Sequence, residues 1–370
     1  MSQAQLAHGP LDRLSEMRKL DTLGMAKLLK NFSKQVQDGI RIGESFKTPR
    51  TLGASIDKIV FAGLGGSAIG GDVIRSLACE IPVPMVVSRH YDLPFFAGKK
   101  TLGIFSSYSG NTEETLSAFR QGVKGSVKSV VITSGGELAE LAQRSSVPWI
   151  RIPKGLPPRS ALGYSVFPLL KLFADLKLWK WDNRGIAETV SLLAELSQKK
   201  FAPEIPFSSN PAKQLAKTLA GKFVVIYAGT ELLDSAALRF RNQIEENAKA
   251  MASHHLLPEM NHNEILGWQF PEKVIPQCAC VFLRDAGDHP RIQLRIKITK
   301  ELIAKRGVPV LEIHSEGKSR LARLFSAIHL GDWVSFYLAI LYKMDPTPVS
   351  IIEYLKGELV KTKEGLNGNP

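Results

Sequence analysis

The chain of 370 residues has few cysteines and no long hydrophobic run. Its three cysteines, Cys79, Cys278 and Cys280, are an odd count that offers no disulfide framework. The last two alternate within an apolar run, as buried residues on one face of a strand do. No stretch approaches the roughly 20 apolar residues that a membrane span needs, and residues 1–22 contain nothing fit for a signal peptide. We therefore expect a soluble cytoplasmic protein with reduced thiols and no membrane contact.

Long basic runs are also missing, although the formal net charge is +13. No basic run is longer than the lysine pair of Gly-Lys-Lys at 98–100 or of Gln-Lys-Lys at 198–200, and no stripe interleaves aromatic with basic residues. We therefore predict no nucleic-acid partner. A dispersed positive field suits attraction of a phosphorylated metabolite, and it equally suits simple solubility.

Strand-like runs alternate with helical patterns through the first half of the chain, after an amphipathic helical region at residues 11–42. Strands separated by helices of ten to fifteen residues predict right-handed crossovers and a parallel sheet covered by helices on both faces. The expected strands cover residues 59–62, 85–87, 101–105, 127–133 and 149–152. The fold class predicted is doubly wound α/β.

A second round of the same alternation begins near residue 222. We infer two copies of one α/β unit, of which the second has lost its glycine-rich loop. The expected elements are strands at residues 222–229, 278–283 and 308–313, helices at 234–251, 289–305 and 321–342, and a polar loop at 254–264. The domains predicted are a helical segment (1–50), a first domain (51–185), a second domain (186–345), and a C-terminal helix and tail (346–370).

The loop after the first strand reads GLGGSA over residues 63–68, which matches the dinucleotide fingerprint G-x-G-x-x-G/A. The acidic residue that would bind a ribose about twenty residues later is missing, and Arg89 would at best suit a 2′-phosphate. Glycines that let a helix approach a strand closely would also explain Gly70 and Gly71. They would not explain Ser67.

Hydroxyl side chains follow the third strand, at Ser107, Ser109 and Thr112. A phosphate monoester needs several donors converging on its oxygens without bulk, and hydroxyls interleaved with glycine at a helix start provide side-chain and backbone donors together. The same residues could instead form an elaborate helix cap. A second glycine loop in the same sheet favours phosphate binding.

The predicted helix at 234–251 has an apolar stripe made of Ala237, Phe240, Ile244, Ala248 and Met251. At 100° per residue, Glu246 lies about 200° from Ile244 and faces away from the helix's own core. Glu245 and Lys249 form an ordinary surface pair at spacing i,i+4. Periodicity alone favours a solvated surface position for Glu246.

The polar loop at 254–264 is dense in histidines and carboxylates, which raises a zinc hypothesis. Neither H-E-x-x-H nor a cysteine pair at ligand spacing is present, so no metal site is predicted. His262 stands between two asparagines and is a candidate general acid or base. A lone loop histidine often has no chemical role.

Five motifs in sequence order resemble those of the bifunctional phosphoglucose/phosphomannose isomerases, which carry two sugar isomerase (SIS) domains. They are GLGGSAIGG (63–71), SYSGNTEET (107–115), PPRSALG (157–163), ENAK (246–249) and PEMNHNE (258–264). The resemblance implies two doubly wound parallel-sheet SIS domains, flavodoxin-like three-layer sandwiches, with N-terminal and C-terminal helices. Leu64 departs from the pattern, in which methionine is expected.

The resemblance also implies which residues act. The phosphate-binding positions correspond to Gly66, Ser67, Ser107, Ser109 and Thr112. Arg159 matches an arginine near the reacting carbons, Glu246 the base that moves a proton between C2 and C1, and Lys356 a lysine near the ring oxygen. His262 matches the group that assists ring opening, and in this family it reaches the site from the other subunit of a homodimer.

The activity implied is the interconversion of glucose 6-phosphate and mannose 6-phosphate with fructose 6-phosphate through a cis-enediol, with no cofactor and no metal. Three alternatives differ from it in what they require. A non-catalytic sugar-phosphate sensor would need neither Glu246 nor His262. An amidotransferase-type sugar isomerase would need a glutaminase domain, and an NADP oxidoreductase would need nucleotide binding.

Overall fold

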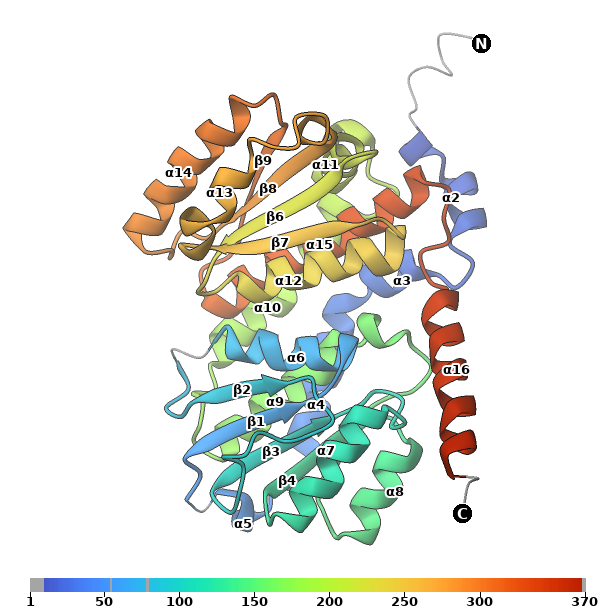
Figure 1. The fold of residues 1–370 in the computed structure, drawn as a ribbon, viewed down its shortest axis with the longest axis vertical. Coiled ribbons are helices and arrows are strands. Elements are labelled where there is room, and N and C mark those ends of the chain that lie inside the picture. The colour runs from blue at the N-terminus through green and yellow to red at the C-terminus, as the bar shows by residue number, and fades with distance from the viewer. Residues whose placement is uncertain (1–9, 54, 78–79, 368–370) are drawn as a thin grey trace.

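The computed structural model describes residues 10–53, 55–77 and 80–367, and it contains two parallel sheets stacked along the long axis with helices around each (Figure 1). Every strand pair is parallel. The strands of the first sheet are β1 (Lys58–Ala62), β2 (Met85–Ser88), β3 (Thr101–Ser106), β4 (Lys128–Thr133) and β5 (Trp149–Arg151). Those of the second are β6 (Phe223–Gly229), β7 (Ala252–Leu257), β8 (Cys278–Arg284) and β9 (Val310–His314).

The two sheets share one topology. The first has the strand order β2-β1-β3-β4-β5 and the second has β7-β6-β8-β9. In each, the first strand in sequence lies inside the sheet, the next strand adds on one side, and the remaining strands add on the other. This is the flavodoxin-like doubly wound order. The predicted fold class and the duplication of one α/β unit are therefore confirmed.

The inner strands are largely apolar because helices cover both faces of each sheet. All six residues of β3 are buried, as are the last four of β1. Cys278 and Cys280 are free and buried on β8, as expected, whereas Cys79 lies outside the described residues.

The N-terminal region forms several short helices where the sequence predicted one or two. They are η1 (Pro10–Asp12), α2 (Leu14–Leu20), α3 (Met25–Lys30), α4 (Phe32–Ser45) and α5 (Arg50–Gly53). The longest, α4, packs against α9 (Leu162–Asp175) through glycines. A Cβ on Gly39 would lie 2.5 Å from the carbonyl oxygen of Gly163, so only glycine permits this close approach.

The remaining helices of the first half surround the first sheet. They are α6 (Gly65–Arg75), α7 (Glu113–Lys124), α8 (Gly136–Arg144) and η3 (Pro158–Ser160). Those of the second half are α10 (Asn183–Leu196), η4 (Ser197–Phe201), η5 (Phe207–Ser209), α11 (Pro211–Leu219), α12 (Asp234–Gln243), η6 (Ile244–Ala248), η7 (Glu259–His262), α13 (Glu264–Gly267), η8 (Ile275–Gln277), α14 (Pro290–Ala304), α15 (Arg320–Leu341) and α16 (Ser350–Asn367).

Helix α15 is the central helix of the second half. The expectation that no stretch approaches the length and apolarity of a membrane span is wrong here: among the described residues α15 is the one helix long and apolar enough, and 89% of that apolar window is buried inside the protein. It packs against α10, α11 and α12, which identifies it as a core helix.

Two predictions about the second half are wrong. The helix expected to reach Met251 ends at Gln243, continues as the π-helical turn η6, and stops at Lys249, whose φ is +55°. Met251 is consequently 78% exposed rather than part of the buried stripe. The polar loop expected at 254–264 begins as strand β7, which pairs with β6 from Ala252 to Leu257. The strand was not predicted because it contains polar residues, and it lies at the edge of the second sheet.

Candidate active site

The two hydroxyl-bearing loops follow neighbouring strands, β1 and β3, at the carboxyl edge of the first sheet. Because β2 lies on one side of β1 and the later strands lie on the other, the boundary between β1 and β3 is the topological switch point. Ligands of open α/β sheets bind at this point. The topology thus brings the two predicted phosphate loops to one place.

The loops are joined by a hydrogen bond between them. Ser67 is buried, and its Oγ accepts the backbone N–H of Tyr108 at 2.9 Å. Gly66, immediately before it, lies against the backbone of η3: a Cβ there would be 2.8 Å from the nitrogen of Arg159. The glycine at this position therefore places η3 beside the loop.

The hydroxyls of the second loop organise the loop rather than cap α7. Ser107 is fully buried, its Oγ lies 2.9 Å from Thr112 Oγ1, and it accepts the backbone N–H of Gly110 at 3.1 Å. Thr112 precedes α7 and makes no side-chain cap bond to it. Ser109 is exposed. The helix start therefore keeps the backbone donors that favour an anion, and the capping alternative does not describe this loop.

Arg159 is buried and connects the two halves of the chain through hydrogen bonds. Its guanidinium donates from Nε to Asn247 Oδ1 at 2.7 Å and from Nη2 to the carbonyls of Pro346 and Thr347 at 2.7 and 2.8 Å. Burial lowers the pKa of Arg159 from its ordinary value, and the charge of Glu246 opposes that shift. One side chain thus holds η3, η6 and the segment before α16 together.

Glu246 lies beside this arginine, with 3.4 Å between Arg159 Nη1 and Glu246 Oε2. Its side chain is 27% exposed, so the carboxylate is reachable by a ligand. It belongs to the π-helical turn η6, a feature that is frequent at functional sites. The structure therefore brings Arg159 and Glu246 together, although periodicity had favoured plain surface for the glutamate.

Lys249 is a cation of this site that the sequence analysis assigned to a surface pair. Glu245 pairs with Arg241 instead, at 3.3 Å. The Lys249 ammonium donates to the carbonyls of Asp345 and Pro346 at 2.7 and 3.2 Å, and burial lowers its pKa. The i,i+4 geometry is lost because η6 is π-helical and Lys249 is left-handed. The spacing of apolar residues could not predict this left-handed conformation of Lys249.

A groove of about 500 Å³ opens beside the catalytic candidates. Its lining combines the two glutamates of η6 with apolar residues that follow η6 and apolar residues at the start of α16 and just before it. The lining residues are Glu245, Glu246, Lys249, Ala250, Met251, Pro348, Val349, Ser350, Ile351 and Ile352.

His262 and Lys356 are not brought to this groove within one chain. Glu246 precedes β7 and His262 follows it, so the strand's six residues, about 20 Å, separate them. His262 is exposed. Lys356 is exposed on α16, one turn beyond the groove-lining Ile352, and Figure 1 shows this helix standing apart from the body.

The fold is shared with solved structures of low sequence identity. A protein from Thermus thermophilus, described as hypothetical, superimposes with a TM-score of 0.73 at 19% identity, covering 99% of this chain and 97% of that one. The C-terminal domain of glucosamine-fructose-6-phosphate aminotransferase from Francisella tularensis gives a TM-score of 0.65 at 17% identity, covering 88% and 98%. Both likenesses concern the fold.

Sequence comparison is more specific. Residues 208–359 match the family model described as bacterial phospho-glucose isomerase C-terminal SIS domain. The bifunctional phosphoglucose/phosphomannose isomerase of Caldicellulosiruptor bescii is 44% identical over 90% of this chain and 98% of its own length, and that of Aquifex aeolicus is 37% identical over 82% and 90%. The chain belongs to the family of bifunctional phosphoglucose/phosphomannose isomerases.

Proposed function

We propose that this protein isomerises glucose 6-phosphate and mannose 6-phosphate reversibly to fructose 6-phosphate. The observation that carries the proposal is the continuous connection from the phosphate loop to the base: Gly66 contacts the backbone of Arg159, and the guanidinium of Arg159 contacts Glu246. A sugar phosphate held by one end at the loops would present its other end to the carboxylate.

The two SIS domains are taken as residues 51–185 and 186–345, flanked by 1–50 and 346–370.

The phosphate is the handle in this mechanism. Ser67, Ser107, Ser109 and Thr112, together with the backbone donors at Gly66 and at the start of α7, would bind the phosphate oxygens. Binding energy gathered there positions the reacting carbons without taking part in the chemical step.

Glu246 is the proton carrier. After ring opening, its carboxylate takes the proton from C2 of the aldose, and the electron pair of the broken C–H bond forms the C1–C2 double bond of the enediolate. The proton of the C2 hydroxyl passes to O1, and the same carboxyl group returns its proton to C1 as C2 becomes the carbonyl carbon of the ketose. The guanidinium of Arg159 keeps positive charge close to where the enediolate charge develops. Protonation of C2 from either face connects both aldoses to one ketose.

The active form proposed is a cytoplasmic homodimer in which His262 of the partner subunit completes the site and assists ring opening. In support, β7 separates His262 from Glu246 within one chain. Exposed apolar side chains surround both parts: Leu266 and Phe270 follow His262, and Ile351 and Tyr354 lie on α16, each at least 67% exposed. Such patches mark interaction sites. Lys356, on the same helix, would reach the ring oxygen once α16 is covered.

The proton transfer is tested by Glu246→Gln, with Glu245→Gln as the matched control. Both carboxylates lie on η6, and Glu245 is paired with Arg241. Deuterium incorporation into fructose 6-phosphate from D₂O reports the exchange directly. We expect Glu246→Gln to lose about 10³-fold or more of turnover and of exchange, and Glu245→Gln to stay within about threefold. Unchanged exchange in Glu246→Gln would refute the mechanism. Tight binding of fructose 6-phosphate by the native protein without any exchange would indicate the sensor instead.

The shared site is tested by mixing two inactive variants, Glu246→Gln and His262→Ala, through co-expression. If His262 acts across the interface, half of the mixed dimers are heterodimers with one intact site, so about a quarter of native activity returns. If His262 acts within its own chain, or if it plays no part, the mixture shows only the sum of the two separate variants.

A further inference from the structure

The second sheet has a switch point of its own, between β6 and β8, because β7 adds on one side and β9 on the other. It lies at the carboxyl edge of the strands, whereas Glu246 lies before β7 at the opposite edge. In an open α/β sheet this is where a ligand binds. The corresponding place in the first sheet is the proposed phosphate site.

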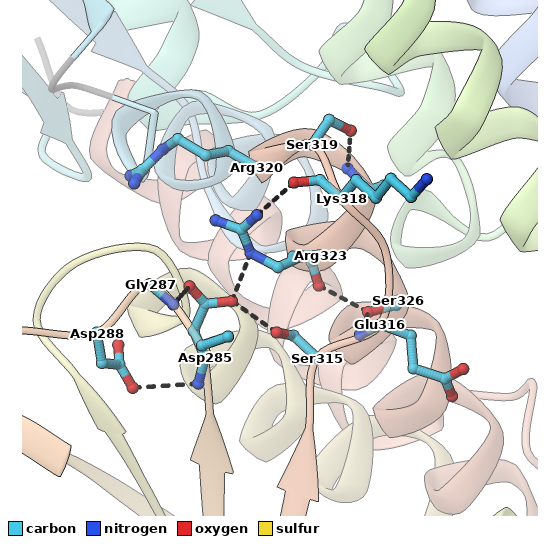
Figure 2. A network of polar contacts seen from close by, with 12 residues as sticks. Asp285, Gly287, Asp288, Ser315, Glu316, Lys318, Ser319, Arg320, Arg323 and Ser326 are labelled. Carbon is cyan, nitrogen blue, oxygen red and sulfur yellow. Dashed lines mark hydrogen bonds and ion pairs between the residues drawn. The ribbon is translucent and has the colours of Figure 1, made fainter.

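A side chain of the protein itself fills this second position. Asp285 is the first residue after β8, as Ser107 is the first after β3. Its side chain is 1% exposed. Figure 2 shows its carboxylate at the centre of a converging set of donors from three segments.

The donors are of the kinds that bind phosphate. The Nε of Arg323 donates to Asp285 Oδ1 at 2.8 Å, and the hydroxyl of Ser315 donates to the same oxygen at 2.6 Å. The backbone N–H of Gly287 donates to Oδ2 at 2.9 Å. A guanidinium, a hydroxyl and a loop N–H around one buried anion form an anion cradle.

The loop closes over this carboxylate through Asp288. The backbone N–H of Asp285 donates to Asp288 Oδ2 at 3.1 Å, and Asp288 Oδ1 lies 3.2 Å from where a Cβ on Gly229 would be. Gly229 ends β6, so both strands of the switch point are covered. Burial raises the pKa of Asp288, and the charge of Asp285 adds to that shift.

We propose that the switch point of the second domain is an anion-binding site that the chain occupies with its own Asp285 carboxylate. The serine after β3 carries no charge, whereas the aspartate after β8 supplies a buried carboxylate. Each chain consequently keeps one site for a substrate phosphate, in the first domain, and the duplicated cradle is used to fasten the loops after β8 and β9 to α15. This goes beyond the isomerase activity, and only the comparison with the first domain rests on the phosphate site proposed there.

The test is chemical rescue with formate, the anion that Asp285→Ala removes. Native protein, Asp285→Ala and Asp285→Asn are heated in sodium formate or in sodium chloride of equal ionic strength. Because a ligand at ten times its dissociation constant stabilises by RT ln 11, we expect formate at that concentration to raise the Tm of Asp285→Ala by about 2 °C over chloride, with a saturating dose dependence. The native protein and Asp285→Asn, whose cradles are filled, should respond equally to both salts.

A second variant keeps the test decisive if Asp285→Ala fails to fold. Asp285→Ser copies Ser107 and retains an acceptor for the N–H of Gly287, and it should show the same selective response to formate. Adding Arg323→Met to it should abolish that response, since the guanidinium that attracts the anion is gone. The proposal is overturned if neither Asp285→Ala nor Asp285→Ser responds to formate more than the native protein, or if Asp285→Asn equals the native protein in stability, because the negative charge would then be dispensable.

Discussion

Replacing Gly66 with alanine tests whether the phosphate loop and the catalytic candidates act as one unit. The new Cβ would lie 2.8 Å from both Arg159 N and the carbonyl carbon of Pro158, and ordinary contact begins at 3.4 Å. Both are backbone atoms, so η3 must move by about 0.6 Å as a piece. The 2.7 Å bond from Arg159 to Asn247 would then stretch to the edge of hydrogen-bonding range.

The functional cost follows from that displacement. A misplacement of about 1 Å at a reacting centre costs on the order of 10²-fold, so a shift of about 0.6 Å predicts a loss of about tenfold in kcat for Gly66→Ala. Steady-state conversion of fructose 6-phosphate to glucose 6-phosphate measures it.

The neighbouring Gly65 provides the control for Gly66→Ala. Its φ is +49°, and a Cβ there meets nothing within 4 Å. Gly65→Ala should therefore cost about 1 kcal/mol of stability by backbone strain and leave Arg159 in place, with kcat close to native. The reasoning is refuted if Gly66→Ala keeps kcat within twofold, or if both variants lose the same activity.

Three further predictions concern ionisable side chains that the structure places between elements. Lys249→Met should lower kcat about tenfold by releasing the carbonyls that Lys249 holds, and Lys249→Arg should recover part of it in the same assay. Arg239→Met leaves Asp332, its partner at 2.8 Å, buried without a cation, so urea unfolding should show a loss of about 3–5 kcal/mol; a loss smaller than about 1 kcal/mol would contradict this. Burial lowers the pKa of His329 to about 3, against about 6.5 in the unfolded chain, so its stabilisation is present above about pH 6.5 and falls by about 2 kcal/mol at about pH 5. His329→Gln should remove that slope from the pH dependence of urea unfolding.

The sequence predicts the fold well because the strands are distinctive. Continuous apolar runs such as β1 and β8 indicate buried strands when short helices separate them, and the crossover rule then fixes a parallel sheet. The polar strand β7 could not be found this way. It lies at the edge of the second sheet, where one neighbour is enough and the residues His254 and His255 remain half-buried. Its pairing with β6 is a long-range property.

The candidate site was predictable in part. The two loops proposed to bind phosphate were located by hydroxyls and glycines next to two strand ends, and strand order explains why the loops lie close together. The place of Glu246 does not follow from periodicity, because a π-helical turn rotates the side chain away from the 100° ladder. Local motifs also say nothing of Arg159 binding Pro346, a contact between residues 187 positions apart.

These contacts show that Arg159 connects segments that are far apart in the sequence. Its backbone is fixed by Gly66 on one side and by Arg239, which donates to its carbonyl oxygen at 2.9 Å, on the other. Its guanidinium donates hydrogen bonds to the carbonyls of Pro346 and Thr347, in the segment before α16. Anything that displaces the phosphate loop must therefore also displace α16, the helix that bears Lys356. That helix is exposed in one chain. If a second subunit covers it and a phosphate binds at Gly66, as proposed, both events act on Arg159, so dimer formation and substrate affinity should be coupled through this side chain.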